Sequence, residues 1–228
     1  MDPGKRTVRS PFDGYPETRA ETDENGGVRF RVTAKVLPPL RAKIADKLGA
    51  ATAVIGVVAA VMYVADHNYP PIALLAAAGI WLGKPLYEKA WREGIRRKVE
   101  IIMTETEFRF RTWTGRWIVF DRELPHSFAV PLHDLARQER DQHELQILKA
   151  QQLKKIVQPR RYYQESFHLV YELLGQRNDI TEIFGKPEAE AVLTRLRAID
   201  EVINARGGGD GTALEPGDQW VEQPGTIP

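Results

Sequence analysis

The sequence predicts an α+β membrane protein, in which a two-helix transmembrane hairpin carries an antiparallel β domain closed by a C-terminal helix. Two uncharged runs, at 48–65 and 69–83, are separated by only three residues. Segments that alternate between apolar and polar residues lie at 28–36 and again from residue 100 onward. An amphipathic helical pattern over 187–205 follows these strands and supplies the closing helix.

Composition limits the chemistry that the chain can carry. The 228 residues have a formal net charge of +1 and include no cysteine. The lack of cysteine excludes disulfides, thiolate zinc sites and thiol catalysis. A net charge this small provides no global field to attract nucleic acid, so any functional basic surface has to be local.

The N-terminal part divides into an arm and a first strand. Residues 1–27 are rich in Pro, Gly and charge and poor in aliphatic residues, which predicts a disordered arm. Residues 28–36 alternate strictly between apolar and polar side chains, which predicts a half-buried strand. Pro38 and Pro39 end this strand, and the remainder of the segment 28–47 leads to the membrane.

The segment 48–87 is predicted to be the transmembrane hairpin. A bilayer core about 30 Å thick needs roughly 17 to 25 helical residues. The first uncharged run is long enough by itself, and the second is long enough if its helix continues through residues 85–87. A soluble protein with a buried helical pair is the alternative. Small residues four apart predict where the two helices pack: Gly56 and Ala60 on the first, Gly79 and Gly83 on the second.

Basic residues flank the hairpin, whereas the connecting loop has none. By the positive-inside rule this predicts an inner (cytoplasmic) membrane protein with both termini in the cytoplasm. These residues are expected to set the orientation; attraction to anionic lipid is the alternative role. They are Arg41, Lys43, Lys47, Arg92, Arg96, Arg97 and Lys98.

The segment 88–205 is predicted to be a cytoplasmic β domain, followed by a disordered tail at 206–228. A glutamine-rich helical insertion is expected at about 135–157, either within the β domain or projecting from it. Pro187 and the apolar stripe after it predict the capping helix 187–205. Strands are expected at 100–113, 116–120, 127–132, 167–174 and 180–184, with a four-residue turn between the last two.

This order of elements resembles that of bacterial membrane proteins with a cytoplasmic pleckstrin-homology-like (PH-like) domain. The resemblance rests on the strand 28–36, the hairpin, the strands of 100–132, and above all 167–205, which includes the run DITEIFGKPEAEAVLTRLRAIDEVI. It implies an antiparallel β-barrel or sheet with a capping helix and a membrane location. It implies no activity, because most members of this family have none assigned.

No catalytic or metal-binding motif is present. The chain contains no Gly-x-Ser-x-Gly, Walker, Gly-x-Gly-x-x-Gly or His-Glu-x-x-His pattern. His126, His133 and His143 do not have the spacing that places two ligands on one helical face. We therefore expect no enzyme activity, no metal and no cofactor.

Basic and aromatic residues supply the candidate contact surface. Its partners are expected to be lipid headgroups or an acidic protein surface, whereas the low net charge argues against nucleic acid; a plain solvated face is the alternative. The sequence thus predicts a non-enzymatic, membrane-anchored module that docks a protein partner, self-associates or contacts anionic lipid of the bilayer. The alternative is a small structural subunit of an envelope transport, secretion or conjugation assembly. The surface comprises Arg109, Arg111, Lys154, Lys155, Arg160, Arg161, Tyr162 and Tyr163.

Overall fold

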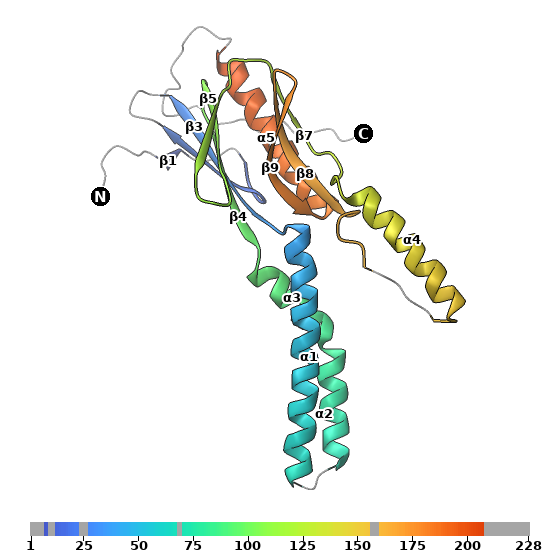
Figure 1. Ribbon diagram of the computed structural model, residues 1–228. Coiled ribbons are helices and arrows are strands. Elements are labelled where there is room, and N and C mark those ends of the chain that lie inside the picture. The colour runs from blue at the N-terminus through green and yellow to red at the C-terminus, as the bar shows by residue number, and fades with distance from the viewer. Residues whose placement is uncertain (1–6, 9–11, 23–26, 68–69, 156–159, 208–228) are drawn as a thin grey trace, which may run out of the picture.

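The computed structural model describes residues 7–8, 12–22, 27–67, 70–155 and 160–207. It consists of a β domain, a helical stalk that projects from one end of that domain, and a separate helical arm (Figure 1). The predicted tail at 206–228 lies outside the described residues, except for the last two residues of the final helix.

In the described part of the chain, nine strands form two antiparallel sheets. The first sheet has the order β1-β2-β3-β4-β5-β6 and the second the order β7-β8-β9. The sequence predicts an antiparallel β-barrel or sheet; the described strands are antiparallel, but they are divided between two sheets. Their bounds are β1 Thr7–Val8, β2 Glu17–Thr22, β3 Val28–Val36, β4 Arg97–Met103, β5 Glu107–Arg111, β6 Trp117–Asp121, β7 His126–Ala129, β8 Ser166–Leu173 and β9 Gln176–Phe184.

Three details of the predicted strands need correction. Part of the arm 1–27 is ordered, because β2 pairs along its whole length with β3. The segment 100–113, which was expected to be one strand, instead forms a hairpin of β4 and β5. Thr104 and Glu107 are hydrogen-bonded across its turn, and Met103 pairs with Phe108. The turn between β8 and β9 is shorter than expected, with Leu174 and Gly175 both at positive φ, as in type I′ hairpins.

The hydrophobic core lies between the two sheets and α5 (Lys186–Gly207). The expected stripe on α5 is buried at Ala189, Val192, Leu196, Ile199 and Ile203. At the centre of the core the rings of Phe108 and Tyr171 stack with centroids 4.3 Å apart. This packing joins β5 of the first sheet to β8 of the second.

The stalk is formed by α1 (Pro39–His67) and α2 (Pro70–Leu82), which pack side by side (Figure 1). Among the described residues only one helical stretch, Pro39–Tyr63, is long and apolar enough to cross a membrane. The predicted two-helix transmembrane hairpin is therefore wrong. The second helix ends at Leu82, and Gly83 lies between it and the charged helix α3 (Lys84–Gly94). Its 13 residues span only about 20 Å.

Small residues on α1 decide how closely the other helices approach it. Ala42, Ala45, Gly49 and Ala53 are buried and recur every three or four residues, so they lie on one face of α1. Small side chains on such a face let neighbouring helix backbones come close. Followed along α1 from the β domain outward, this face contacts α3 first and then α2.

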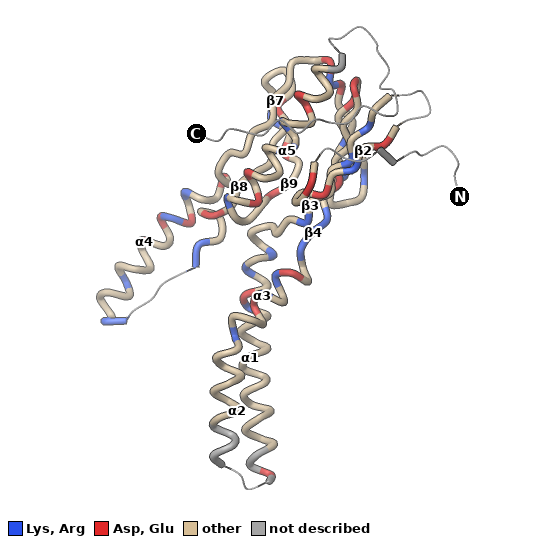
Figure 2. The backbone as a smooth tube through the Cα atoms, turned by 180° about the vertical axis from the view of Figure 1, so that it is seen from behind, with Lys and Arg blue, Asp and Glu red and all other residues tan. Residues whose placement is uncertain are grey.

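The glutamine-rich segment forms α4 (Ala136–Gln152), which projects from the β domain as a separate arm (Figure 1). It belongs to neither sheet. Charged residues gather in the β domain, α3 and α4, whereas the α1–α2 pair beyond α3 is almost free of them (Figure 2). The region where α1, α3 and the segment after α4 meet is thus the boundary between a charged body and an apolar stalk.

Candidate functional site

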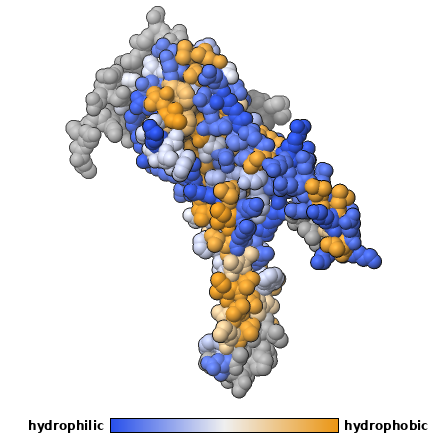
Figure 3. Space-filling model, in the orientation of Figure 1, coloured by the Kyte–Doolittle hydropathy of each residue, from blue (hydrophilic) through white to orange (hydrophobic). Residues whose placement is uncertain are grey.

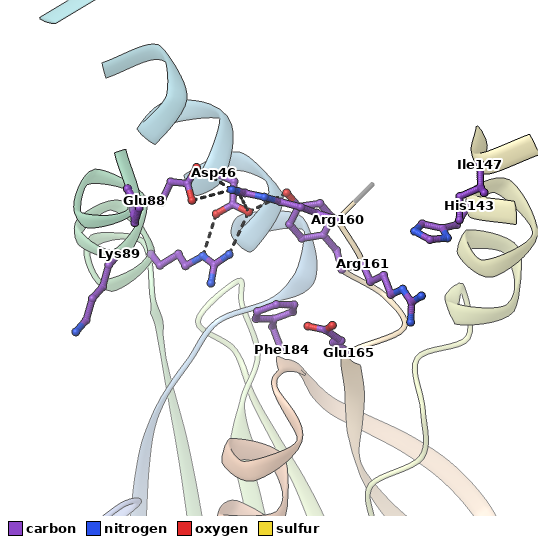
Figure 4. A pocket seen from close by; sticks show the side chains of 12 residues that line it. Asp46, Glu88, Lys89, His143, Ile147, Arg160, Arg161, Glu165 and Phe184 are labelled. Carbon is purple, nitrogen blue, oxygen red and sulfur yellow. Dashed lines mark hydrogen bonds and ion pairs between the residues drawn. The ribbon is translucent and has the colours of Figure 1, made fainter. Parts of the chain in front are cut away.

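A network of five side chains occupies this boundary, and we call it the junction network. Asp46 is on α1, Glu88 and Arg92 are on α3, and Arg160 and Tyr162 precede β8 (Figure 4). Asp46 accepts hydrogen bonds from Nε and Nη2 of Arg92 at 2.9 and 3.1 Å, and from the Tyr162 hydroxyl at 2.8 Å. The network therefore ties α1 and α3 to the segment that enters β8.

Arg160 is the central member of the junction network. Its Nη1 lies 2.6 Å from Oδ2 of Asp46, and its Nη2 donates to both carboxylate oxygens of Glu88 at 3.0 and 2.9 Å. Hydrogen bonding to Glu88, with a further contribution from Asp46, raises the pKa of the Arg160 guanidinium despite its partial burial. Two carboxylates thus face two guanidinium groups, so the network is internally balanced in charge.

Tyr162 acts as a hydrogen-bond donor in this network over the physiological pH range. Burial, followed by its hydrogen bond to Asp46, raises the pKa of its phenol to about 12. The phenol therefore stays protonated, and its O–H donates a hydrogen bond to the Asp46 carboxylate.

Gly49 allows the junction network to form. A Cβ atom at this position would lie 2.6 Å from Cγ, 2.8 Å from Cα and 2.8 Å from the backbone nitrogen of Glu88. Only glycine permits this approach of α1 to α3. The contact places Glu88, which is 8% exposed, within reach of Arg160.

Helix α4 fixes the segment that carries Arg160 and Tyr162. The carboxylate of Glu139 accepts hydrogen bonds from the backbone N–H groups of Tyr162, Tyr163 and Gln164, at 2.7 to 3.1 Å. Hydrogen bonds to a charged acceptor are stronger than those between neutral groups. One side chain of the arm therefore orients the loop that completes the junction network.

A pocket of about 920 Å³ opens beside the junction network, and we call it the stalk pocket. Helices α3 and α4 and the segment 160–165 form its walls (Figure 4). Besides the junction network it is lined by three further cationic or imidazole side chains, one acid and three apolar residues. These are Lys89, Arg161, His143, Glu165, Pro85, Ile147 and Phe184.

The predicted contact residues are divided among three places. Arg109 and Arg111 lie on the exposed face of β5, where Arg109 pairs with Glu107 and Arg111 with Glu100. Lys154 and Lys155 follow the end of α4, the arm that projects away from the β domain (Figure 1). The structure therefore does not assemble these residues into one surface.

The rest of the predicted cluster lies at the junction. Arg160 and Tyr162 turn inward to the carboxylates, whereas Arg161 lines the stalk pocket. Tyr163 packs against the His133 ring, with centroids 4.8 Å apart.

Most of the predicted membrane-flanking basic residues have structural partners. Arg92 binds Asp46, and Arg96 binds Glu188 at 2.8 Å and Glu93 at 3.0 Å. Arg41 donates to the Ile95 carbonyl, and Lys98 pairs with Glu100 at 2.7 Å. Arg97 begins β4, while Lys43 and Lys47 are exposed on α1.

The predicted packing residues also differ in their surroundings. A Cβ at Gly56 would lie 2.9 Å from Cγ2 of Ile80, so this glycine marks a close contact between α1 and α2. Ala60 is half-buried on the same helix. A Cβ at Gly79 would meet no described atom within 4 Å, and the three atoms nearest to one at Gly83 would belong to Gly79, Ile80 and Tyr87, in the adjoining helical turns. The tightest approach, at Gly49, has no counterpart in the prediction.

A second cluster of titratable groups lies at the foot of α4. The rings of His133 and His168 stack with centroids 4.4 Å apart, and His168 is 6% exposed. Burial, and then the neighbouring His133, lower the pKa of His168. Within the described residues neither ring nitrogen of His168 has a hydrogen-bond partner, and no group of three or more His, Asp or Glu side chains is placed to hold a metal ion.

The comparisons with known proteins identify no relative: no protein-family model, curated protein or solved structure matches this chain. The resemblance to PH-like membrane proteins consequently stays a prediction from element order. The chemistry of the site has to be argued from its own geometry.

Proposed function

We propose that the protein is a non-enzymatic, membrane-anchored interaction module, in which α1 enters a lipid bilayer and the junction network holds the β domain at the membrane surface. The observation that carries this proposal is the exposure of α1. Only 22% of its most apolar 18-residue window is buried within the protein. The exposed apolar side chains are Val54, Ile55, Val58, Val61, Met62 and Tyr63.

An apolar surface of this kind is unfavourable in water. Burying one large aliphatic side chain stabilises by about 1.5–3 kcal/mol, and soluble monomers rarely expose large contiguous apolar patches. The apolar residues extend along the stalk, away from the β domain (Figure 3). The alternative of a soluble protein with a buried helical pair is disfavoured, because the β domain leaves this part of α1 uncovered.

The flanking charges support an orientation for the anchored protein. Lys43, Lys47, Lys84 and Lys89 lie at the end of the apolar region nearest the β domain, whereas Asp66 lies near its far end. Under the positive-inside rule this distribution favours a cytoplasmic β domain.

The exposed face of the β5–β6 hairpin is the part of the module that we propose contacts a protein partner. Trp113 is 80% exposed, and Trp117 and Val119 are exposed on β6, an edge strand of the six-stranded sheet. On β5, Arg111 is the cross-strand neighbour of Trp117, and Arg109 is that of Val119. Exposed aromatic and arginine side chains are enriched at interaction hot spots, and an edge strand offers unpaired backbone groups.

Membrane association is tested with the full chain by carbonate extraction and vesicle flotation. We expect the wild type to float with vesicles, and a variant carrying Ile55→Glu and Met62→Glu to remain in the soluble fraction. A matched variant carrying Arg116→Glu and Arg137→Glu, at exposed positions outside α1, should float like the wild type. A wild-type chain that stays soluble would overturn the proposal.

The protein-contact surface is tested separately, with a photo-crosslinking amino acid at position 117 in intact cells. We expect a discrete adduct that is lost on Trp113→Ala. The same amino acid at exposed position 35 serves as the control and should give no such adduct. Equal crosslinking at both positions would contradict a specific surface on β5–β6.

A further inference from the structure

Helix α4 points in the same general direction as the apolar stalk. Both leave the same end of the β domain, and the C-terminal end of α4 lies apart from the stalk but at the level of α3 (Figure 1, Figure 2). At the start of α3 the ammonium nitrogen of Lys84 lies 5.6 Å from the centre of the exposed Trp81 ring. Trp and Lys are typical of the membrane–water interface. In the anchored state that we propose, the end of α4 therefore comes to the headgroup region.

The end of α4 is a defined turn. The N–H of Lys155 donates to the Ala150 carbonyl at 2.8 Å, and the N–H of Lys154 donates to the Gln151 carbonyl at 3.0 Å. With the positive φ of Lys154, these two hydrogen bonds form the Schellman motif that commonly ends helices. The motif holds Leu153, Lys154 and Lys155 at the end of the arm, and we call these three residues the arm tip.

The arm tip and the turn before it expose apolar side chains. Leu153 is 66% exposed, and Leu148, in the preceding turn of α4, is 55% exposed. Figure 3 shows apolar residues at the surface of α4 among hydrophilic ones. Exposed leucine side chains are unfavourable in water, and they are stabilised where they enter the boundary between the headgroups and acyl chains of a bilayer.

The charges of α4 are divided along its length. Its first half mixes acidic and basic residues, whereas the sequence from 145 through 159 has three lysines and no acid. The three are Lys149, Lys154 and Lys155, and all are exposed. Within the described residues, none of them takes part in an ion pair. Exposed leucines beside unpaired lysines are complementary to an anionic lipid surface, which offers phosphates at the headgroups and an apolar layer beneath them.

We propose that the arm tip, together with Leu148 and Lys149, contacts the surface of an anionic bilayer and so forms a second membrane contact beside α1. Glu139 ties α4 to the segment that carries Arg160, and the junction network ties that segment to α1 and α3. Two connected contacts with the membrane restrict how far the β domain can tilt above it. This inference rests on the proposed membrane anchoring by α1.

The test follows a fluorescent probe at three positions of the full chain. Because the sequence has no cysteine, Val58→Cys, Leu153→Cys and Leu174→Cys each accept a thiol-reactive nitrobenzoxadiazole probe at one site. Val58 is exposed on the apolar part of α1. Leu174 is the matched control for Leu153, since it is an exposed leucine in the turn between β8 and β9, at the end of the β domain away from the stalk (Figure 1). The labelled proteins are reconstituted into phosphatidylcholine vesicles with or without phosphatidylglycerol, and nitroxide-labelled lipid serves as the quencher.

The three positions separate the arm contact from the anchor. We expect quenching at 58 in both mixtures, quenching at 153 that is at least threefold stronger with phosphatidylglycerol, and none at 174. Quenching at 58 without quenching at 153 would overturn the arm contact and leave the anchor in place, whereas no quenching at 58 would refute the anchor. Equal quenching at 153 in both mixtures would refute the role of the lysines. A shift of the emission at 153 without quenching by lipid would place the arm against protein, such as a second copy, and would also overturn the proposal.

Two double variants of the 153-labelled chain test the charges of the arm tip. Lys154→Gln with Lys155→Gln removes two cations of the tip, and Arg137→Gln with Arg140→Gln removes two exposed cations nearer to the β domain on the same helix. Each lysine close to an anionic surface strengthens the contact about fivefold. We therefore expect the first variant to lower the phosphatidylglycerol-dependent quenching at least threefold and the second to leave it nearly unchanged. Equal losses would refute a specific contact at the tip, and unchanged thermal unfolding in both variants controls for misfolding.

Discussion

Substitution of Gly49 by alanine should destabilise the protein, although alanine is the better helix former. In an isolated helix the change from glycine to alanine stabilises by about 1 kcal/mol. Here the new Cβ would lie 2.6 Å from Cγ and 2.8 Å from Cα of Glu88. Ordinary van der Waals contact begins near 3.4 Å, so α1 and α3 would have to separate by roughly 0.8 Å. The backbone of α3 is part of the contact, and a side-chain rotation cannot relieve it.

The size of the effect follows from two opposing contributions. Overpacking of this kind costs about 1–3 kcal/mol, and the same displacement lengthens the hydrogen bonds between Arg160 and Glu88. Subtracting the gain of about 1 kcal/mol in helix propensity leaves about 0–2 kcal/mol from overpacking. The weakened hydrogen bonds to Glu88 add to this, so we expect a net destabilisation of about 1–2 kcal/mol. For a chain of this size that corresponds to a melting temperature lower by about 2–8 °C.

Gly79→Ala is the matched control for this prediction. It makes the same chemical change in a helix, but the added Cβ meets no described atom within 4 Å. We expect its melting temperature to equal or exceed that of the wild type. Both variants are measured by circular dichroism in the same neutral detergent. A Gly49→Ala protein as stable as Gly79→Ala would refute the close packing of α1 against α3.

Two further predictions concern the ionisable clusters. Arg160→Met leaves Glu88 with Lys84, at 3.9 Å, as its one cationic partner among the described residues. Because Arg160 is partly exposed, we expect a cost of about 1–3 kcal/mol. In a double-mutant cycle with Glu88→Gln, denaturant unfolding should give a coupling of about 1–2 kcal/mol, and a coupling near zero would contradict the network. For the buried histidine, the folded pKa lies below the ordinary 6.5, so the unfolded chain binds the proton more readily and stability is lost as pH falls below about 6.5. His168→Gln should therefore make the decline in melting temperature between pH 7 and pH 5 less steep. If the decline were unchanged, it would have to come from other groups. The charged or titratable groups around the His168 ring are His133, Asp134, Arg177 and Asp179.

The parts of the fold that follow from local patterns could be predicted from the sequence. The alternation at 28–36 gives β3 with the expected bounds, and the stripe at 187–205 gives the buried face of α5. A further indication lies in whether the buried apolar residues have odd or even numbers. Val99, Ile101 and Met103 are buried at odd positions, whereas Phe108 and Phe110 are buried at even positions. That change of parity marks the turn that divides the expected strand 100–113 into β4 and β5.

The junction network could not be predicted in the same way, because its members are far apart in the sequence. Asp46 and Arg160 are separated by more than a hundred residues, and their contact depends on the approach of α3 at Gly49. The one local signal was the presence of acids at the ends of the apolar runs, Asp46 before the first and Glu88 after the second. Carboxylates at these positions need cationic partners when the helices pack.

The same contacts change which cations are available to lipid. Counted along the sequence, the basic residues after the second apolar run form a cluster that is adjacent to a membrane. In the structure Arg92 and Arg96 are held by Asp46 and Glu188, so their charges already have partners within the protein. Orientation during insertion depends on the number of Lys and Arg residues and only weakly on Asp and Glu, so these ion pairs leave the orientation argument intact. Lipid recognition, however, needs unpaired cations at the surface, and the two arginines of the junction network, which are paired with Asp46 and Glu88, do not meet this requirement.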